Sequence, residues 1–196
     1  MNKKPIILIG AGGHAESCID LINEQNKFKI QEVIGTKKEL HKVLLNKFKV
    51  KFDDTHLKTL SKKYKYALIG IGQIHNYEIR KKTFAKLRSL KFTLPTVCSK
   101  HSIISKYCSI GEGTVVMHGA IISANVKIGK NCIINSNALI EHGCLIEDNV
   151  HIATSVTINS GVTIGQNSFV GSGTVIRQSV KVKKNSFIKM QSTIKK

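Results

Sequence analysis

The chain has 196 residues, of which 41% are hydrophobic and 22% are charged, a composition typical of one or two globular domains. It contains no run of about 18 apolar residues, so we expect no transmembrane helix. The short apolar run near the N-terminus does not resemble an export signal, and we therefore expect a cytoplasmic protein.

The net charge of +19 is unevenly distributed along the chain. Residues 1–98 carry 20 basic and 8 acidic side chains, residues 99–176 carry four of each, and residues 177–196 carry seven basic and no acidic ones. Proteins that bind nucleic acid usually present a continuous basic face with arginine or aromatic residues, but arginine occurs here only three times. We expect no nucleic-acid partner. Two separate basic regions suit small polyanions such as nucleotides or coenzyme A.

The five cysteines do not indicate a disulfide framework or a zinc ribbon. Their number is odd, no CxxC pair occurs, and three of them fall at core positions of the repeat described below. We interpret them as small buried hydrophobic residues in a reducing compartment.

The N-terminal half contains the pattern of a small βαβ unit. Residues 5–10 predict a buried strand, a glycine turn follows, residues 15–26 predict a helix, and residues 32–35 predict a second strand. Gly10, Gly12 and Gly13 supply the turn, which falls short of the full GxGxxG pattern. Such a turn lets backbone N–H groups approach a phosphate at the helix N-terminus, although a tight turn without a ligand shows the same pattern.

Farther along, residues 67–72 predict another short buried strand, and residues 76–90 predict a basic helix. Residues 37–66 are rich in lysine and show no periodicity that predicts an element. The first half is therefore predicted to be a Rossmann-like α/β subdomain covering residues 1–98.

The second half has a strict period of six residues. The sixteen positions at steps of six from Ile104 to Ile194 all hold Ile or Val, and small residues stand two positions before most of them. Such anchors would spiral around an α-helix, whereas in short strands both positions point to one face. The pattern predicts a parallel β-helix over residues 99–196, with three hexads in each of about five coils and turn-forming residues directly after the anchors.

The halves together carry a specific set of motifs: Gly10-Ala11-Gly12-Gly13-His14, then Ile71-Gly72 before an arginine-bearing helix, then hexapeptide coils containing Ile140-Glu141-His142. This combination resembles the sugar acetyltransferase family of sialic-acid O-acetyltransferases and nucleotide-linked 4-amino-sugar N-acetyltransferases. The resemblance covers nearly the whole chain. It implies a left-handed β-helix that forms a homotrimer, acetyl-CoA bound between neighbouring β-helices, and a nucleotide sugar bound by the βαβ domain.

The resemblance also implies roles for individual residues. The catalytic base would be His142. The substrate-binding residues would be Gly12, Gly13, His14, Thr36, Gly72 and Asn135, and the acetyl-CoA-binding residues would be His151, Gly171, Ser172 and Met190.

Three features depart from the family pattern. Gly143 stands where many members carry an acidic residue after the catalytic histidine, and Thr36 and Lys37 stand where an acidic pair is common. The usual C-terminal Gly-x-Pro-Ala-Lys motif is not matched. Glu141 and Asn135 are the remaining candidates for orienting His142.

These observations predict an acetyl-CoA-dependent N-acetyltransferase acting on a nucleotide-linked 4-amino-4,6-dideoxy sugar for bacterial surface-glycan synthesis. His142 would act as general base in a direct transfer. An O-acetyltransferase of the sialic-acid type and a catalytically silent scaffold remain alternatives. A zinc site shared by His118, His142 and His151 is not expected, because these residues do not form a compact ligand set. The sequence defines neither the sugar nor its nucleotide carrier.

Overall fold

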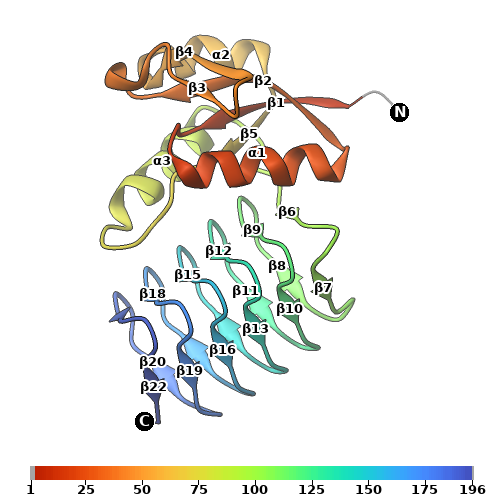
Figure 1. Ribbon diagram of the computed structural model, residues 1–196, viewed down its shortest axis with the longest axis vertical. Helices are drawn as coiled ribbons and strands as arrows, with labels where there is room; N and C mark the ends of the chain where they lie inside the picture. Colours follow the sequence, from red (N-terminus) through yellow and green to blue (C-terminus); the bar gives the residue numbers. More distant parts are fainter. Residues whose placement is uncertain (1–2, 196) are drawn as a thin grey trace. The chain divides into compact units, whose positions relative to one another are not determined.

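The computed structural model describes residues 3–195 of the chain, which form two compact units (Figure 1). The first unit contains the residues up to Gly72 together with Glu78–Pro95, and the second contains Gln73–Tyr77 together with the residues from Thr96 onward. None of the helices in the described part of the chain is long and apolar enough to cross a membrane.

The first unit is built around a five-stranded sheet with the strand order β3-β4-β2-β1-β5. Its elements are β1 (Lys4–Ile9), α1 (Gly13–Gln25), β2 (Phe28–Gly35), β3 (Val43–Leu44), β4 (Phe48–Asp53), α2 (Leu57–Lys63), β5 (Tyr66–Ile69) and α3 (Glu78–Ser89), with short 3-10 helices at Lys37–Glu39 and Asp54–His56. Strands β1, β2, β4 and β5 are parallel, and β3 pairs antiparallel with β4. The segment without a readable pattern, residues 37–66, thus contributes two strands, a helix and both 3-10 turns.

The side chains of the buried strand β1 alternate between the two faces of the sheet and contribute to the core on each face. Ile7 and Ile9 pack in one core cluster with Leu57, Leu60 and Leu87 from α2 and α3. Since neighbouring residues of a strand point to opposite faces, Ile6 and Leu8 are buried on the other face of the sheet. A parallel sheet buried on both faces is the Rossmann-like arrangement that the sequence predicted.

The second unit is a left-handed parallel β-helix whose coils each contribute one two-residue strand to three sheets (Figure 1). Sheet I contains β6 (Val97–Cys98), β9 (Val115–Val116), β12 (Ile133–Ile134), β15 (His151–Ile152), β18 (Phe169–Val170) and β21 (Phe187–Ile188). Sheet II contains β7 (Ile103–Ile104), β10 (Ile121–Ile122), β13 (Leu139–Ile140), β16 (Thr157–Ile158), β19 (Val175–Ile176) and β22 (Thr193–Ile194). Sheet III contains β8 (Ser109–Ile110), β11 (Lys127–Ile128), β14 (Leu145–Ile146), β17 (Thr163–Ile164) and β20 (Lys181–Val182).

The six-residue period fixes the register between coils. Each residue pairs with the residue 18 positions later, as Ile122 does with Ile140, so three hexads complete one coil. The predicted anchors are the second residues of the strands, and those of the middle coils are fully buried. At the two ends of the β-helix the anchors are only partly buried, because no further coil covers them. These anchors are Ile104, Ile110, Val182, Ile188 and Ile194.

The turn position differs from the one that the sequence predicted. From Ile110 to Ile188, the residue that adopts the left-handed conformation is the third after the anchor, with φ between 56° and 70°, and not the first. These residues are Gly113, Gly119, Asn125, Asn131, Asn137, Gly143, Asn149, Ser155, Gly161, Asn167, Gly173, Ser179, Asn185 and Gln191. Gly and Asn predominate because they adopt positive φ at the lowest steric cost.

Asparagines form a hydrogen-bonded ladder along the corner between sheets III and I. The side-chain amide of Asn131 donates to Asn149 at 2.9 Å, Asn149 to Asn167 at 3.1 Å, and Asn167 to Asn185 at 2.9 Å. Each residue lies one coil below the last and occupies the left-handed turn position. The ladder therefore pairs polar side chains at a corner where a positive φ favours asparagine or glycine.

The degree of burial along the β-helix predicts different losses of stability for the same mutation at two equivalent anchors. Ile158 in β16 is fully buried, and Ile194 occupies the same column two coils later but is only partly buried. We expect Ile158→Ala to lower the free energy of unfolding by about 2–5 kcal/mol, since it leaves a cavity. Ile194→Ala should cost less than half as much. Denaturant unfolding followed by circular dichroism measures both; equal losses would contradict a core that ends at the last coil.

Candidate active site

The glycine turn lies at the carboxyl edge of the sheet in the first unit. The chain runs outward from β1 through β2 to β4 and then crosses to β5 on the other side of β1. The carboxyl ends of β1 and β5 therefore border the point where the strand order reverses, which is where open α/β sheets bind ligands. The turn after β1 and Gly70–Gly72 after β5 are located at this point.

The glycines of this turn have different structural roles: Gly10 is required by the backbone, whereas Gly12 and Gly13 leave open space. Gly10 has a φ of +119°, and a Cβ there would lie 2.9 Å from the backbone of Gly70, so the fold itself requires glycine. Gly12 is the N-cap of α1 with a φ of −96°, and a Cβ on Gly12 or Gly13 would meet nothing within 4 Å. These two glycines leave space beside the first N–H groups of α1, an arrangement that accepts a phosphate.

His14 and Gly72 are brought together at the same edge. A Cβ on Gly72 would lie 3.6 Å from the Cβ of His14, and both residues are at least partly accessible. The Sγ of Cys18 lies 3.7 Å from Nε2 of His14. Burial raises the pKa of Cys18 to about 12, so this thiol is protonated and acts as a neighbour of the imidazole and not as a nucleophile.

Thr36 follows β2, the strand next to β1, and its environment was not visible in the sequence. The carboxylate of Glu39 accepts hydrogen bonds from the backbone N–H of Thr36 at 2.8 Å and from its hydroxyl at 2.9 Å. The sequence departed from the family pattern by placing Thr36 and Lys37 at this strand end. The fold nevertheless supplies a carboxylate there, three residues later than expected.

His142 lies on the corner between sheets II and III, in the turn between β13 and β14, and is exposed. The equivalent positions of the other coils hold Lys106, Ala124, Ser160 and Gln178. Among these five residues, only His142 carries an imidazole, the side chain that most often serves as a general base. Within the described part of a single chain, its ring has no hydrogen-bond partner, so both ring nitrogens are accessible.

Glu141 and Asn135, the two candidates for orienting His142, are hydrogen-bonded to other groups in the described part of one chain. The carboxylate of Glu141 accepts a hydrogen bond from the hydroxyl of Ser123 at 3.4 Å, and the amide oxygen of Asn135 accepts one from the backbone N–H of Ser136 at 2.8 Å. Asn135 lies on the corner between sheets I and II, at the opposite edge of sheet II. Gly143 occupies the left-handed turn position with a φ of +70°, which explains a glycine there.

Three of the residues assigned to acetyl-CoA lie on the same corner as Asn135. Ser172 and Met190 are exposed, and 70% of the surface of Met190 is accessible. Gly171 is buried, and a Cβ there would clash with the backbone nitrogen of Met190. The close approach of the next coil is thus a sufficient reason for glycine at position 171.

His151 occupies a different environment from the other predicted residues. It is the outward-facing residue of β15 in sheet I and is 7% exposed. Its Nδ1 is hydrogen-bonded to the backbone carbonyl of Gln73, whose side-chain amide donates to the carbonyl of Asn149 at 2.7 Å. The ring of Phe169 packs edge-on against the imidazole. His151 thus anchors the segment Gln73–Tyr77 to the β-helix.

The three histidines weighed for zinc are dispersed over the β-helix. His118 lies on the corner between sheets I and II, where its Nδ1 is 2.8 Å from the hydroxyl of Ser99. His142 lies on the next corner and His151 on a strand. Residues 3–195 contain no group of three or more His, Cys, Asp or Glu side chains that could hold a metal ion.

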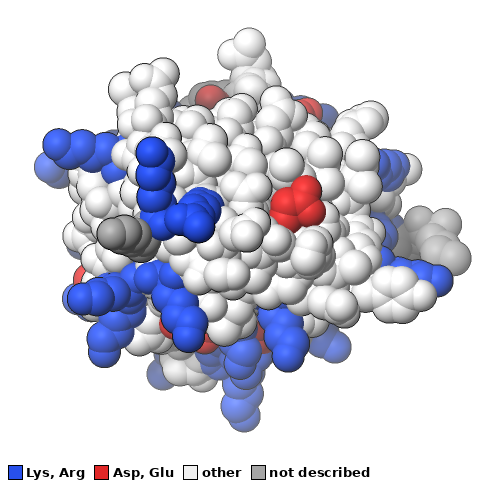
Figure 2. All heavy atoms as spheres, turned by 90° about the horizontal axis from the view of Figure 1, so that it is seen from below, with Lys and Arg blue, Asp and Glu red and all other residues white. Residues whose placement is uncertain are grey.

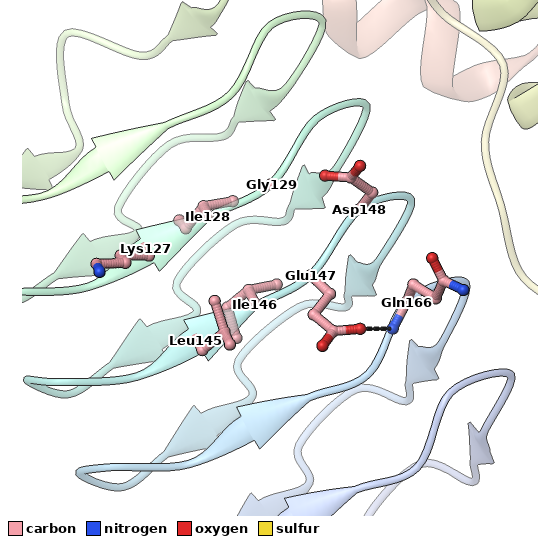
Figure 3. Close-up of a pocket in the computed structure, with 8 residues that line it drawn as sticks. All are labelled: Lys127, Ile128, Gly129, Leu145, Ile146, Glu147, Asp148 and Gln166. Carbon is pink, nitrogen blue, oxygen red and sulfur yellow. Dashed lines mark hydrogen bonds between the residues drawn. The ribbon is translucent and has the colours of Figure 1, made fainter.

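A pocket of about 340 Å³ lies on sheet III and its corner with sheet I (Figure 3). It is lined by Lys127, Ile128, Gly129, Leu145, Ile146, Glu147, Asp148 and Gln166. Both carboxylates bind backbone N–H groups of adjacent coils, Glu147 that of Gln166 and Asp148 that of Lys130, each at 2.8 Å. The pocket contains none of the predicted catalytic or binding residues, and its acidic groups are engaged in holding the coils together.

Three family models match parts of the chain. Residues 5–87 match the PglD N-terminal domain, residues 107–142 and 143–178 match the bacterial transferase hexapeptide repeats, and residues 125–160 match the hexapeptide repeat of succinyl-transferase. The chain thus combines a PglD N-terminal domain with transferase hexapeptide repeats, which confirms the predicted resemblance to the sugar acetyltransferase family. The predicted enzyme class, an acyltransferase, agrees with these families. No curated protein matches the chain in sequence.

Solved structures share the fold over almost the whole chain. A perosamine N-acetyltransferase from Caulobacter crescentus, a histidine-to-asparagine variant in complex with CoA and GDP-perosamine, is 23% identical with a TM-score of 0.91 over 98% of this chain and 89% of its own. The acetyltransferase domain of PglB from Neisseria gonorrhoeae, in complex with acetyl coenzyme A, is 24% identical with a TM-score of 0.87 over 98% and 93%. WeeI from Acinetobacter baumannii is 20% identical with a TM-score of 0.73 over 97% and 94%. These structures confirm the predicted fold class.

The two kinds of glycine in the turn after β1 predict opposite effects on stability. Gly10→Ala forces a side chain into a positive φ and against the backbone of Gly70, and we expect it to cost about 2 kcal/mol or more. Gly12→Ala fits an extended backbone with open space, so the free energy of unfolding should change by less than about 1 kcal/mol. Denaturant titration compares both variants with the wild type, and a large loss in Gly12→Ala would mean that the fold, and not a ligand, requires this glycine.

Proposed function

We propose that the protein is an acetyl-CoA-dependent N-acetyltransferase. Its proposed substrate is a nucleotide-linked 4-amino-4,6-dideoxy sugar used for bacterial surface-glycan synthesis in the cytoplasm. The observation that carries the proposal is the presence in one chain of a glycine turn open at the sheet's switch point and of an exposed imidazole on a hexapeptide β-helix. The solved structures that share the fold include a perosamine N-acetyltransferase in complex with CoA and GDP-perosamine.

The first unit is the proposed nucleotide-sugar site. Gly12 and Gly13 leave the N-terminus of α1 accessible, and a diphosphate there accepts hydrogen bonds from backbone N–H groups and is stabilised by the helix dipole. His14 and Gly72 border the same position, and Thr36 with the Glu39 carboxylate lies at the next strand end. A carboxylate at the end of β2 is suited to bind hydroxyl or N–H groups of a nucleoside.

Sheet II supports the proposed homotrimer. The residues that it directs outward include Ile103, Ile121 and Val175, which are 66%, 38% and 42% exposed, and the half-buried Leu139. The strands of this sheet lie along the lower side of Figure 1. The face seen from below in Figure 2 is mainly uncharged, with an acidic side chain near its middle and most lysines and arginines toward its edges. An apolar sheet face bordered by charge is suited to packing against another subunit.

A cyclic trimer also explains why the predicted residues divide between two corners. His142 lies along one edge of sheet II, and Asn135, Ser172 and Met190 lie along the other. In a cyclic assembly two different edges of one surface face each other across every interface. We propose that His142 of one subunit and the residues of the other edge from its neighbour form one acetyl-CoA site, with groups of the neighbour orienting the imidazole.

The proposed reaction needs one proton acceptor and no covalent intermediate on the protein. The sugar amine attacks the thioester carbonyl of acetyl-CoA, His142 accepts the proton that the nitrogen loses, and the sulfur leaves and is protonated to give CoA. The products are the N-acetylated sugar nucleotide and free CoA, so the atoms balance without a metal or redox step. Backbone N–H groups of the coil corners are suited to stabilise the oxyanion.

The role of His142 predicts a large change in turnover. We expect His142→Ala to lower kcat by about 10²–10⁴-fold with little change in the KM for acetyl-CoA, the usual effect of removing a general base. Gln178→Ala is the matched control, because Gln178 holds the same corner position two coils later. Release of free thiol, followed with acetyl-CoA and amino-sugar nucleotides, measures both; wild-type turnover in His142→Ala would exclude this residue as the base.

The proposed interface predicts a change in mass. Light scattering should give the wild type three times the 21.6 kDa of one chain. Ile121→Asp places a carboxylate on the exposed face of sheet II and should yield monomers without acetyl transfer. Lys127→Asp makes a comparable substitution on sheet III and should remain trimeric. A monomeric wild type, or an Ile121→Asp variant that stays trimeric, would contradict packing through sheet II.

A further inference from the structure

Lys42 connects a distant part of the first unit to the glycine turn. It lies in the loop between the 3-10 helix Lys37–Glu39 and β3, and its Nζ donates a hydrogen bond to the carbonyl oxygen of Ala11 at 2.7 Å. The two residues are 31 positions apart in the sequence. Ala11 directly precedes Gly12, so the ammonium is located beside the turn whose N–H groups are open to an anion.

The backbone of Lys42 is held on both sides. Its N–H donates to the carbonyl of Glu39 at 3.1 Å, and its carbonyl accepts from the N–H of Val50 at 2.8 Å. The side chain therefore extends from a fixed point at the start of the β3–β4 hairpin. A fixed backbone lowers the entropic cost of keeping the ammonium beside the turn.

The charge of Lys42 is not neutralised by the protein. Lys51 and Lys86 of the same unit lie near the carboxylates of Glu32 and Asp54, at 3.9 and 3.2 Å. Within residues 3–195, no carboxylate forms such a pair with Lys42, whose ammonium contacts only a neutral carbonyl. That contact uses one of its three N–H donors and leaves two for a further acceptor.

The location of this cation is unfavourable without a ligand. The N-terminus of a helix carries a partial positive charge, so a lysine is disfavoured there and an anion is favoured. An unpaired ammonium and the first amides of α1 thus meet at one place, which a bound anion would stabilise from both sides. Gly12 and Gly13 keep that place free of side chains.

We propose that Lys42 is a diphosphate-binding residue, whose ammonium contacts the diphosphate of the nucleotide sugar together with the amides of the glycine turn. The inference rests on the proposed function, since it takes the nucleotide sugar to bind in the first unit. It adds that the diphosphate, and not only the nucleoside, determines affinity there. Affinity should therefore fall from nucleoside diphosphate to monophosphate to nucleoside for any base.

Calorimetric titration of the full-length protein tests this proposal. UDP, GDP and dTDP serve as probes, with the corresponding nucleosides, and acetyl-CoA is titrated separately. Lys42→Met should weaken the tightest-binding diphosphate by about 10–100-fold, the usual loss when a hydrogen bond to a charged group is removed. It should leave nucleoside binding within twofold of the wild type, and Lys42→Arg should restore most of the diphosphate affinity.

Two variants serve as comparisons. Lys62→Met removes an exposed lysine of α2 and should bind every probe as the wild type does. Gly12→Val places a side chain in the open space of the turn and should abolish diphosphate binding while acetyl-CoA still binds. Thermal unfolding without ligand shows whether each variant is folded.

The titrations distinguish a failure of the role proposed for Lys42 from a failure of the proposed nucleotide-sugar site. If Lys42→Met binds the diphosphate within twofold of the wild type, or loses nucleoside and diphosphate equally, Lys42 only ties the hairpin to the turn and this inference is wrong. If the wild type binds no nucleoside diphosphate, or if Gly12→Val binds it normally, the proposed nucleotide-sugar site is wrong, and the inference fails with it.

Discussion

The structure of the second unit depends on one constraint, the pairing of each residue with the residue 18 positions later. Because a coil has three strands of two residues, every sixth side chain must fill the interior, and the sixteen Ile and Val anchors do so. The corners from Gly113 to Gln191 each hold one residue in the left-handed conformation. Side chains that face outward do not have to fill the interior of the β-helix, and His142, Ser172 and Met190 occupy such outward-facing positions. Stability and chemistry therefore use different positions of one six-residue unit.

In the first unit, too, the residues that the fold requires differ from the residues that leave space for a ligand. Gly10 is required by the backbone, whereas Gly12 and Gly13 leave an accessible helix N-terminus that the fold itself does not need. An anion there would be held mainly by backbone amides, which no side-chain motif reveals. Charges near the turn come from separate segments, Lys42 beside Ala11 and Glu39 beside Thr36. This accounts for a candidate site whose sequence signal is limited to a few glycines.

Much of the fold could be predicted from the sequence, because both halves repeat a local pattern. The anchors specified the β-helix and its three strands per coil, and the buried runs with the glycine turn specified β1, α1 and β5. The turn position was predicted wrongly, since Gly, Asn, Ser and Gln share it and their common feature is a backbone angle. Residues 37–66 gave no pattern, because β3 and β4 are short and half exposed.

The candidate site was less accessible to sequence reasoning. His142 was identified from the Ile140-Glu141-His142 motif and the family resemblance, but its orientation cannot follow from one chain, in which Glu141 and Asn135 bind other groups. The burial of His151 depends on Gln73, which is 78 residues away. The contact of Lys42 with Ala11 is of the same long-range kind. Such contacts arise from the packing of elements, which the periodicity of either segment does not encode.

We propose above all that this protein transfers the acetyl group of acetyl-CoA to the amine of a nucleotide-linked sugar. Mass spectrometry of the products from UDP-, dTDP- and GDP-linked 4-amino sugars tests it most directly, with hydroxylamine treatment to remove acetyl groups from oxygen. We expect one acetyl group on a sugar nucleotide, resistant to hydroxylamine, in the wild type, and far less of this product in His142→Ala. An acetyl group that hydroxylamine removes would indicate an O-acetyltransferase, and no acetylated product from any sugar would indicate a scaffold; either result would contradict the account.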